Sequence, residues 1–341
     1  MATLSKSNVQ CIQIEVQGFY SMIKILSIDG GGIRGILPAM LLAEIENRTN
    51  KKTVELFDLI AGTSTGGILA LGLNKPDLTF KGKPKYSAQE LVDLYEKEGT
   101  KIFRPDLLEG FWTDAGGTFH PKYPFEGLEQ VLDTYFGDTR LSESLKDVLI
   151  TSYDLERRRP QIFLSSQAKQ KISEDFPMKL VGRATSAAPT YFEPLKLNKP
   201  NSSDYYALVD GGVYANNPAM YAYVEAKRVY KNVNDDFVFV SLGTGEISKR
   251  IPYENARTWG LANWAQPILD VVFDGVDDAV NYQLQQLIPY DKYYRVQPIL
   301  INVDERMDNA KPDNVFSLKL LADNLIHTHS QTIDRLCKLL V

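Results

Sequence analysis

Cysteine is almost absent from this chain of 341 residues, in which only Cys11 and Cys337 occur. Two cysteines cannot build a disulfide framework, and their scarcity is typical of a protein from a reducing compartment. Histidine is equally scarce and is limited to His120, His327 and His329. Because neither cysteine stands at a metal-ligand spacing and so few imidazoles are available, the sequence predicts no metal site.

A long hydrophobic run and an excess of basic residues are also missing. No apolar stretch reaches the length of a transmembrane span, and the N-terminus lacks the basic-then-apolar pattern of a signal peptide. The formal net charge of −5 excludes the basic footprint that binding to a nucleic-acid polymer requires. Together with the scarce cysteine, these absences lead us to expect a cytoplasmic protein.

What the sequence does contain is an alternation of apolar, β-branched runs with helical patterns. Strands are predicted at 22–28, 56–62, 147–152, 161–166, 205–210 and 237–245, and helices from Ile33 and around 87–98, 126–135 and 217–230. Such alternation, with almost continuously apolar strands, favours an α/β fold with helices on both faces of a mostly parallel sheet. We expect one domain over 22–341. Residues 1–21 form an N-terminal extension that is either an upstream addition or an extra edge strand.

Four other segments have less regular patterns. The predicted loops at 74–87 and 104–124 are long enough to serve as lids or binding walls, and the second is rich in aromatic residues. The stretch 263–288 predicts an amphipathic helix whose polar face is acidic, which favours packing on the core over membrane contact. Three arginines at 157–159 are interpreted as a hairpin turn between two strands.

A first glycine-rich turn spans 29–35 and reads DGGGIRG. It satisfies the G-x-G-x-x-G pattern of a dinucleotide-binding turn between a strand and a helix. Against that interpretation, the second strand runs into AGTSTGG instead of ending in an acidic residue, and Asp29 would repel a pyrophosphate. The turn also offers backbone N–H groups at a helix N-terminus, a setting suited to a developing oxyanion. A purely structural tight turn is the third alternative.

A second glycine-framed turn, GTSTG at 62–66, matches the G-x-S-x-G pattern that lifts a serine hydroxyl clear of a sheet. Gly62 and Gly66 are needed there because any side chain would collide with the neighbouring strand or helix. The pattern alone occurs by chance in many chains, but here an apolar strand precedes it and an apolar helix follows it. Ser64 is therefore a candidate nucleophile, with a buried turn serine without chemistry as the alternative.

A serine nucleophile needs a base, and the chain offers few histidines for that role. The better candidate is Asp210 in ALVDGG, at the end of an apolar strand and next to two glycines that permit close approach. The alternative is an Asp-Gly pair that only forms a turn. An ordinary aspartate has too low a pKa for this work near neutral pH, so we expect burial to raise the pKa of Asp210.

With these three pieces in order, the chain closely resembles the patatin-like phospholipases. The matching elements run in family order across nearly the whole chain from Met22. They are DGGGIRG (29–35), GTSTG (62–66), ATSAAPTYFEP (184–194), DGG (210–212), SLGTG (241–245) and YYRVQ (293–297).

The resemblance implies a patatin-like three-layer sandwich and lipid acyl hydrolysis by a Ser–Asp dyad through an acyl-enzyme, without calcium or another cofactor. Carried over to this sequence, Ser64 is the nucleophile, Asp210 is its base, and Gly62 and Gly66 frame the nucleophile turn. The same resemblance implies that Gly30, Gly31, Gly32 and Arg34 form or support the oxyanion site.

The implied activity is of the phospholipase A type, on fatty-acyl esters of glycerophospholipids or galactolipids. Such an enzyme meets its membrane substrate peripherally, and the aromatic loop 104–124 is the expected contact surface. Bacterial members of the family include phospholipases switched on by cyclic nucleotides, so such an activator is a candidate partner. Two other functions stay open: a nucleotide-binding enzyme or sensor that uses the GGGIRG turn, and a catalytically silent lipid-binding or storage protein. The oligomeric state is left open.

Overall fold

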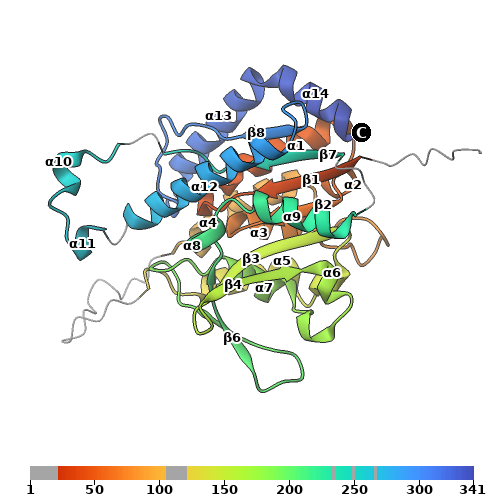
Figure 1. Ribbon diagram of the computed structural model, residues 1–341, viewed down its shortest axis with the longest axis horizontal. Helices are drawn as coiled ribbons and strands as arrows, with labels where there is room; N and C mark the ends of the chain where they lie inside the picture. The colour runs from red at the N-terminus through yellow and green to blue at the C-terminus, as the bar shows by residue number, and fades with distance from the viewer. Residues whose placement is uncertain (1–21, 105–120, 232–235, 248–249, 265–266) are drawn as a thin grey trace, which may run out of the picture.

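The computed structural model describes residues 22–104, 121–231, 236–247, 250–264 and 267–341. Within them the chain forms one central sheet with helices on both sides, as Figure 1 shows. Residues 1–21 and most of the loop 104–124 lie outside the described residues, so the predictions that concern them stay predictions.

The sheet has the strand order β5-β6-β3-β2-β1-β7-β8, with β4 paired to β3 off this path. Its strands are β1 (Ile23–Ile28), β2 (Leu59–Gly62), β3 (Asp147–Asp154), β4 (Arg159–Leu164), β5 (Leu195–Asn198), β6 (Tyr205–Asp210), β7 (Phe237–Leu242) and β8 (Tyr293–Val296). The pairs β1–β2, β2–β3, β1–β7 and β7–β8 are parallel, whereas β3–β4, β3–β6 and β5–β6 are antiparallel. The predicted α/β fold with a mostly parallel sheet is therefore confirmed.

Helices cover both faces of this sheet. Before β3 they are the 3-10 turn η1 (Gly32–Gly35), α1 (Ile36–Thr49), α2 (Thr53–Leu56), α3 (Thr65–Asn74), α4 (Ala88–Ile102), α5 (Glu126–Phe136) and η3 (Leu141–Glu143). After it come α6 (Ser165–Ala168), η4 (Ile172–Glu174), α7 (Met178–Thr185), α8 (Gly212–Ala215), α9 (Ala219–Val229), α10 (Tyr253–Ala256), α11 (Leu261–Trp264), α12 (Pro267–Leu287), α13 (Pro312–Thr328) and α14 (Ser330–Leu340).

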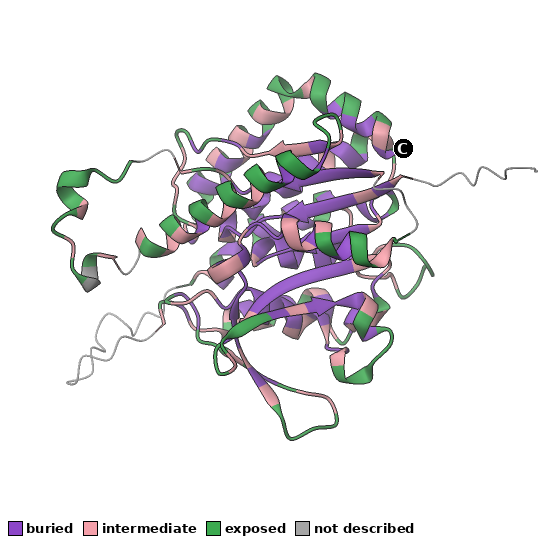
Figure 2. Cartoon of the chain, viewed as in Figure 1, coloured by how far each residue is buried: buried purple, intermediate pink, exposed green. Residues whose placement is uncertain are grey.

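The core consists of two buried clusters, one on each face of the sheet. The larger cluster joins the sheet to α1, α3, α4, α5, α7, α13 and α14, and the smaller one joins it to α9 and the end of α12. Figure 2 shows the central strands as almost wholly buried. Strands that are apolar on both sides fit this arrangement, because a parallel sheet is covered on both faces.

The predicted boundaries differ from the structure in several places; the strand expected at 237–245, for example, ends at Leu242. The strand expected from residue 56 begins at Leu59, because 53–56 form the short helix α2. The strand expected at 161–166 ends at Leu164, where α6 begins. The short edge strands β5 and β8 were not predicted, because four residues are too few to display a period.

Strand register explains why distant segments meet at one edge of the sheet. Gly62, the last residue of β2, pairs with Ile150 on β3. Two residues further along β3, Ser152 pairs with Asp210, the last residue of the antiparallel strand β6. Since Ser64 also stands two residues beyond Gly62, the register brings positions 64 and 210 to the same level.

The amphipathic stretch and the arginine run have clear positions. The predicted hairpin at 157–159 is confirmed between β3 and β4, and Arg157 pairs there with Asp154 and Asp204. Helix α12 packs on α8 and α9, and Phe273 and Leu284 are its buried residues. Among the helices that the structure describes, none is both long and apolar enough to cross a bilayer.

Candidate active site

The turn between β2 and α3 presents Ser64 in a strained backbone conformation. Ser64 has a φ of 54°, which non-glycine residues rarely adopt and which is common at functional turns. A Cβ on Gly62 would collide with the carbonyl of Gly66, and one on Gly66 would collide with the carbonyl of Ile28. The Ser64 N–H donates to Thr185 Oγ1 at 2.8 Å, which fixes the turn against α7. These contacts explain why glycine frames the serine.

Asp210 faces this serine at the end of β6. Asp210 is 2% exposed, and its carboxyl group accepts a hydrogen bond from the Gly212 N–H at 2.8 Å and lies close enough to the Ser64 hydroxyl for that group to affect its pKa. Burial raises the pKa of Asp210 to about 7, and the Ser64 hydroxyl and the Gly212 N–H oppose that shift. The carboxyl group is thus matched to proton transfer near neutral pH, in the direction expected from the sequence.

The glycine turn after β1 lies beside the serine turn, and its N–H groups have different partners. Gly30 N–H donates to Asn216 O at 3.1 Å, Ile33 N–H to Met307 O at 2.8 Å, and Arg34 N–H to Gly31 O at 3.2 Å. Within the described part of the chain, the N–H groups of Gly31 and Gly32 have no hydrogen-bond partner. Gly31 and Gly32 also line the pocket that contains Ser64, so they are the available donors of this turn.

Of the four residues predicted to form or support the oxyanion site, Gly30 and Arg34 are placed only to support it. The amide of Gly30 is already bonded, and a Cβ there would meet the side chains of Asn216 and Ser64, so Gly30 provides room instead of a donor. The Arg34 side chain does not line the pocket; it is 5% exposed, and its Nε donates to Gly31 O at 3.4 Å. Burial lowers the pKa of Arg34, and the carboxylates of Asp270 and Asp274 on α12 oppose that effect. Arg34 can act on the oxyanion site only by supporting its backbone.

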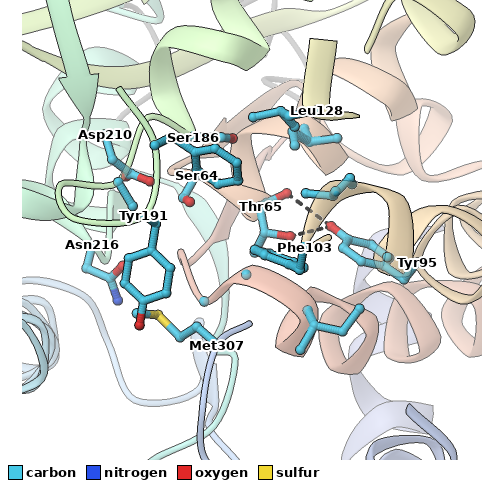
Figure 3. A pocket seen from close by; sticks show the side chains of 18 of the residues that line it. Ser64, Thr65, Tyr95, Phe103, Leu128, Ser186, Tyr191, Asp210, Asn216 and Met307 are labelled. Atoms are coloured by element: carbon cyan, nitrogen blue, oxygen red, sulfur yellow. Dashed lines mark hydrogen bonds between the residues drawn. The ribbon is translucent and has the colours of Figure 1, made fainter. Parts of the chain in front are cut away.

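The pocket beside Ser64 is polar at one end and apolar elsewhere. Figure 3 shows Ser64 and Asp210 facing each other on one side, with Tyr191 and Met307 near them. The apolar lining is Ile33, Ile68, Leu94, Ile102, Phe103, Leu128, Ala188, Tyr191, Phe192, Phe273 and Met307. No lysine or arginine occurs among the described residues that line it. Such a pocket fits a hydrocarbon chain next to a reacting carbonyl group.

Several lining residues were not predicted from the sequence. Ser186 follows Thr185, and its buried hydroxyl has no hydrogen-bond partner among the described residues. Tyr95 on α4 shares a 2.5 Å hydrogen bond with Thr65, the residue after the candidate nucleophile. Thr185 and Ser186 belong to the ATSAAPTYFEP stretch, and this match to the family was the sequence signal that could have identified them. Nothing in that stretch, however, assigned either residue a role. Of the histidines, His327 and His329 lie near the junction of α13 and α14 and do not line the pocket. His120 lies outside the described residues.

Asp29, which precedes the glycine turn, belongs to a buried ionic network. Arg295 Nη2 on β8 contacts Asp29 Oδ2 at 2.6 Å and Asp277 Oδ1 on α12 at 2.6 Å. Gln297 Nε2 also donates to Asp277 Oδ2 at 2.9 Å. Part of the acidic face predicted for 263–288 therefore points into the protein, where these carboxylates balance buried arginines.

Comparisons with known proteins agree with one another at the level of the family. The model of the family described as "Patatin-like phospholipase" matches residues 26–223. The chain is 32% identical to "Patatin-like protein 4" of Arabidopsis thaliana, over 91% of this chain and 84% of that protein. It is also 32% identical to "Probable inactive patatin-3-Kuras 1" of Solanum tuberosum, over 94% of this chain and 92% of that protein. A crystal structure of VipD from Legionella pneumophila aligns with 12% identity and a TM-score of 0.35, over 89% of this chain and 67% of that one, a likeness too low to add to the argument.

Proposed function

Since the chain belongs to the patatin-like phospholipase family, whose membership supports lipid acyl hydrolase activity, we propose that it is a phospholipase A-type enzyme with a Ser64–Asp210 dyad. The observation that carries the proposal is the position of the Ser64 hydroxyl opposite a buried carboxyl group, that of Asp210, at the polar end of an apolar pocket (Figure 3). No other serine among the lining residues has a carboxylate partner and a strained turn together.

Acylation begins when the ester carbonyl of the lipid lies beside Ser64. The Ser64 oxygen attacks the carbonyl carbon, and its proton passes to Asp210 as the new C–O bond forms. The resulting oxyanion accepts hydrogen bonds from the N–H groups of Gly31 and Gly32, which are available for this in the described structure. The bond to the leaving alcohol then breaks, and Asp210 returns the proton to that alcohol or lysolipid.

Deacylation repeats the same proton movements with water. Asp210 accepts a proton from a water molecule, whose oxygen attacks the acyl-enzyme carbonyl, and the same two amides hold the second oxyanion. When the intermediate collapses, the fatty acid leaves and the proton returns to Ser64. A histidine is not needed, because burial raises the pKa of Asp210 to about 7 and so makes the carboxylate a sufficiently strong base.

The lining of the pocket supports a lipid substrate. Its apolar walls fit a fatty-acyl chain of a glycerophospholipid or galactolipid, and no basic residue among the described lining residues offers a nucleotide phosphate a cationic partner. No observation therefore favours the nucleotide-binding alternative. We further propose that hydrolysis is independent of calcium and that the protein is cytoplasmic, with peripheral contact at membranes. Activation by a cyclic nucleotide stays a prediction, which calorimetry with such ligands would check.

Product analysis tests the proposed function. The full chain is incubated with mixed phospholipids, galactolipids and neutral glycerides in the presence of EDTA, and released fatty acid is measured by mass spectrometry. We expect fatty acid and lysolipid from the wild type and none from Ser64→Ala, with Ser186→Ala as the matched hydroxyl control that keeps activity. Because one relative carries the printed name of a probable inactive patatin, labelling of Ser64 by a fluorophosphonate is measured in parallel. Equal fatty-acid release from wild type and Ser64→Ala would contradict the proposal.

A further inference from the structure

Residues 250–264 and 267–271, here called the outer segment, lie outside the layered body of the protein (Figure 1). They comprise α10, α11 and the first residues of α12, and Figure 1 shows α10 and α11 standing apart from the sheet and its covering helices. Four large apolar residues in this segment are exposed. They are Ile251 at 42%, Tyr253 at 74%, Ile268 at 43% and Val271 at 44% of the residue surface. Apolar exposure concentrated in so short a segment commonly marks an interaction surface.

The outer segment also carries two of the three tryptophans of the chain. Trp259 and Trp264 pack edge to face with ring centroids 5.2 Å apart, and both are partly exposed. Together with Tyr253, they give the segment three amphipathic aromatic side chains. Tryptophan and tyrosine favour the boundary between water and hydrocarbon, because their rings are apolar while each keeps a polar group.

A groove lies between the outer segment and the candidate active site and shares two wall residues with the pocket that contains Ser64. Ile251, Trp259 and Val271 line one part of this groove. Tyr191 and Met307 line another part, and both of these residues also line the pocket that contains Ser64. The exposed apolar segment therefore borders a groove that adjoins the Ser64 pocket, which is not true of an isolated surface patch.

The charges of the outer segment favour an uncharged or zwitterionic partner. The segment contains two arginines, Arg250 and Arg257, and two acidic residues, Glu254 and Asp270, so its formal charge is zero. Arg257 Nε is paired with Glu254 Oε2 at 3.1 Å. An anionic membrane surface attracts clusters of unpaired lysine and arginine, and the described residues of this segment offer no such cluster.

We propose that the outer segment docks the protein on a zwitterionic phospholipid surface and delivers lipid along the groove to Ser64. The substrate part of this inference rests on the proposed function, whereas the docking part does not. Docking is driven by insertion of Tyr253, Ile268 and the tryptophan pair into the interface, so it requires neither anionic lipid nor low ionic strength.

Vesicle flotation with the full-length chain tests the docking surface. Tyr253→Asp/Ile268→Asp places two charges on the outer segment without touching a residue that lines the Ser64 pocket. Leu78→Asp/Tyr290→Asp is the matched control, since Leu78 is 85% and Tyr290 97% exposed elsewhere on the surface. Vesicles of pure phosphatidylcholine, and of phosphatidylcholine mixed with phosphatidylglycerol, are compared at low and high salt.

We expect the outer-segment variant to lose about tenfold or more of its binding to phosphatidylcholine vesicles, with the control variant unchanged. In a Trp112→Phe background, tryptophan emission should shift to the blue on vesicle addition and be quenched by brominated lipid. Hydrolysis of vesicle lipid should fall with binding, while hydrolysis of a short, soluble ester should stay unchanged. A wild type that binds vesicles but hydrolyses neither substrate would contradict the proposed function alone.

Four results would overturn the docking proposal. One is vesicle binding by the outer-segment variant that equals that of the wild type. A second is binding that needs phosphatidylglycerol or disappears at high salt, because the attraction would then be electrostatic. A third is a large gain in soluble-ester hydrolysis in the variant, which would identify the segment as a lid. The last is a wild-type dimer that the variant converts to a monomer in light scattering, which would mean that a second copy covers the segment.

Discussion

Asp29 and Asp210 stand in similar sequence contexts, since each follows an apolar strand run and is followed by glycines, three after Asp29 and two after Asp210. Both are almost fully buried, at 1% and 2% exposed, and burial raises the pKa of both carboxyl groups. Their partners differ. Asp29 contacts the guanidinium of Arg295, whereas Asp210 accepts a hydrogen bond from the Gly212 amide, faces the Ser64 hydroxyl (Figure 3) and has no cationic partner among the described residues.

The difference separates a structural carboxylate from one suited to chemistry. The guanidinium of Arg295 holds Asp29 in place. Because Arg295 lies on β8 and also contacts Asp277 on α12, it links the start of the glycine turn to both of these elements. Burial raises the pKa to about 7 at both positions, so the two carboxyl groups differ in what they face: Asp210 has no such cation and lies opposite the Ser64 hydroxyl (Figure 3), to which it can offer a proton acceptor. Local sequence is similar in the two places, and the tertiary partner decides the role.

The largest expected effect is on the rate of hydrolysis. Asp210→Asn removes the base and should lower kcat/KM by about 10³-fold, within the range that general-base catalysis contributes. Asp29→Asn should lower it by less than about tenfold, because it alters only the support of the glycine turn. Fatty-acid release measured on the correctly folded fraction of each variant checks this. Similar losses in the two variants would remove the distinction between the carboxylates.

Stability should change in opposite directions in the same two variants. Asp29→Asn leaves the buried Arg295 with Asp277 alone, which should lower the free energy of unfolding by about 2–3 kcal/mol. A raised folded-state pKa means that the stability contributed by Asp210 is complete at low pH and is lost as pH rises through about 7. At pH 8 Asp210→Asn should therefore be more stable than wild type, on the order of 2 kcal/mol after the lost hydrogen bonds are subtracted.

Urea unfolding of both variants at pH 8 and at a pH below the folded-state pKa of Asp210 measures these differences. The gain from Asp210→Asn should shrink at the lower pH, where wild-type Asp210 is protonated and uncharged. A destabilised Asp210→Asn at pH 8 would mean that the carboxylate is held by more than the Ser64 and Gly212 donors.

The pH dependence of the rate should follow Asp210 alone. Because the base must be deprotonated, kcat/KM should rise with pH to a plateau with an apparent pKa of about 7, falling about tenfold per pH unit below it. Asp29→Asn should keep that midpoint, since the two carboxyl groups have separate partners. Initial rates on a soluble ester across this range check the expectation, and a midpoint that moves in Asp29→Asn would show that the two groups titrate together.

The sequence predicted the central part of the fold because its strands are long and apolar. β1, β3, β6 and β7 were located by their buried runs, and the G-x-S-x-G turn located Ser64 where β2 meets α3. Short elements such as β5 and β8 carry too little pattern to be recognised. β8 matters for the site, since it holds Arg295, the partner of Asp29.

The sequence predicted which residues form the site better than it predicted what each of them does there. Ser64 and Asp210 face each other as expected, but which glycine amides are available depends on Asn216 and Met307, which come from distant loops. The position of Arg34 outside the pocket likewise depends on α12, whose acidic residues were expected to form a solvent-facing polar side. Such pairings across the fold leave no signal in a local motif.

The smallest expected effects come from removing two buried hydroxyl groups. One of them contacts Ser64, which faces Asp210, and the other contacts Arg295, which is paired with Asp29. Thr185 Oγ1 accepts the Ser64 N–H at 2.8 Å, and Ser241 Oγ accepts Arg295 Nη1 at 2.9 Å. Thr185→Val and Ser241→Ala each leave one buried donor unpaired, so each should cost about 1–2 kcal/mol of unfolding free energy.

Only Thr185→Val should also lower kcat, by about tenfold, because Ser64 stands in a strained turn whose orientation depends on that bond and small misplacements are costly to the rate. Ser241→Ala should keep wild-type kcat, since Arg295 retains both of its carboxylates. Thermal unfolding and initial rates on a soluble ester measure the two quantities in the same preparations. If both variants lost the same fraction of kcat, stability rather than the position of the nucleophile would govern the rate, and Asp29 and Asp210 would belong to one coupled site.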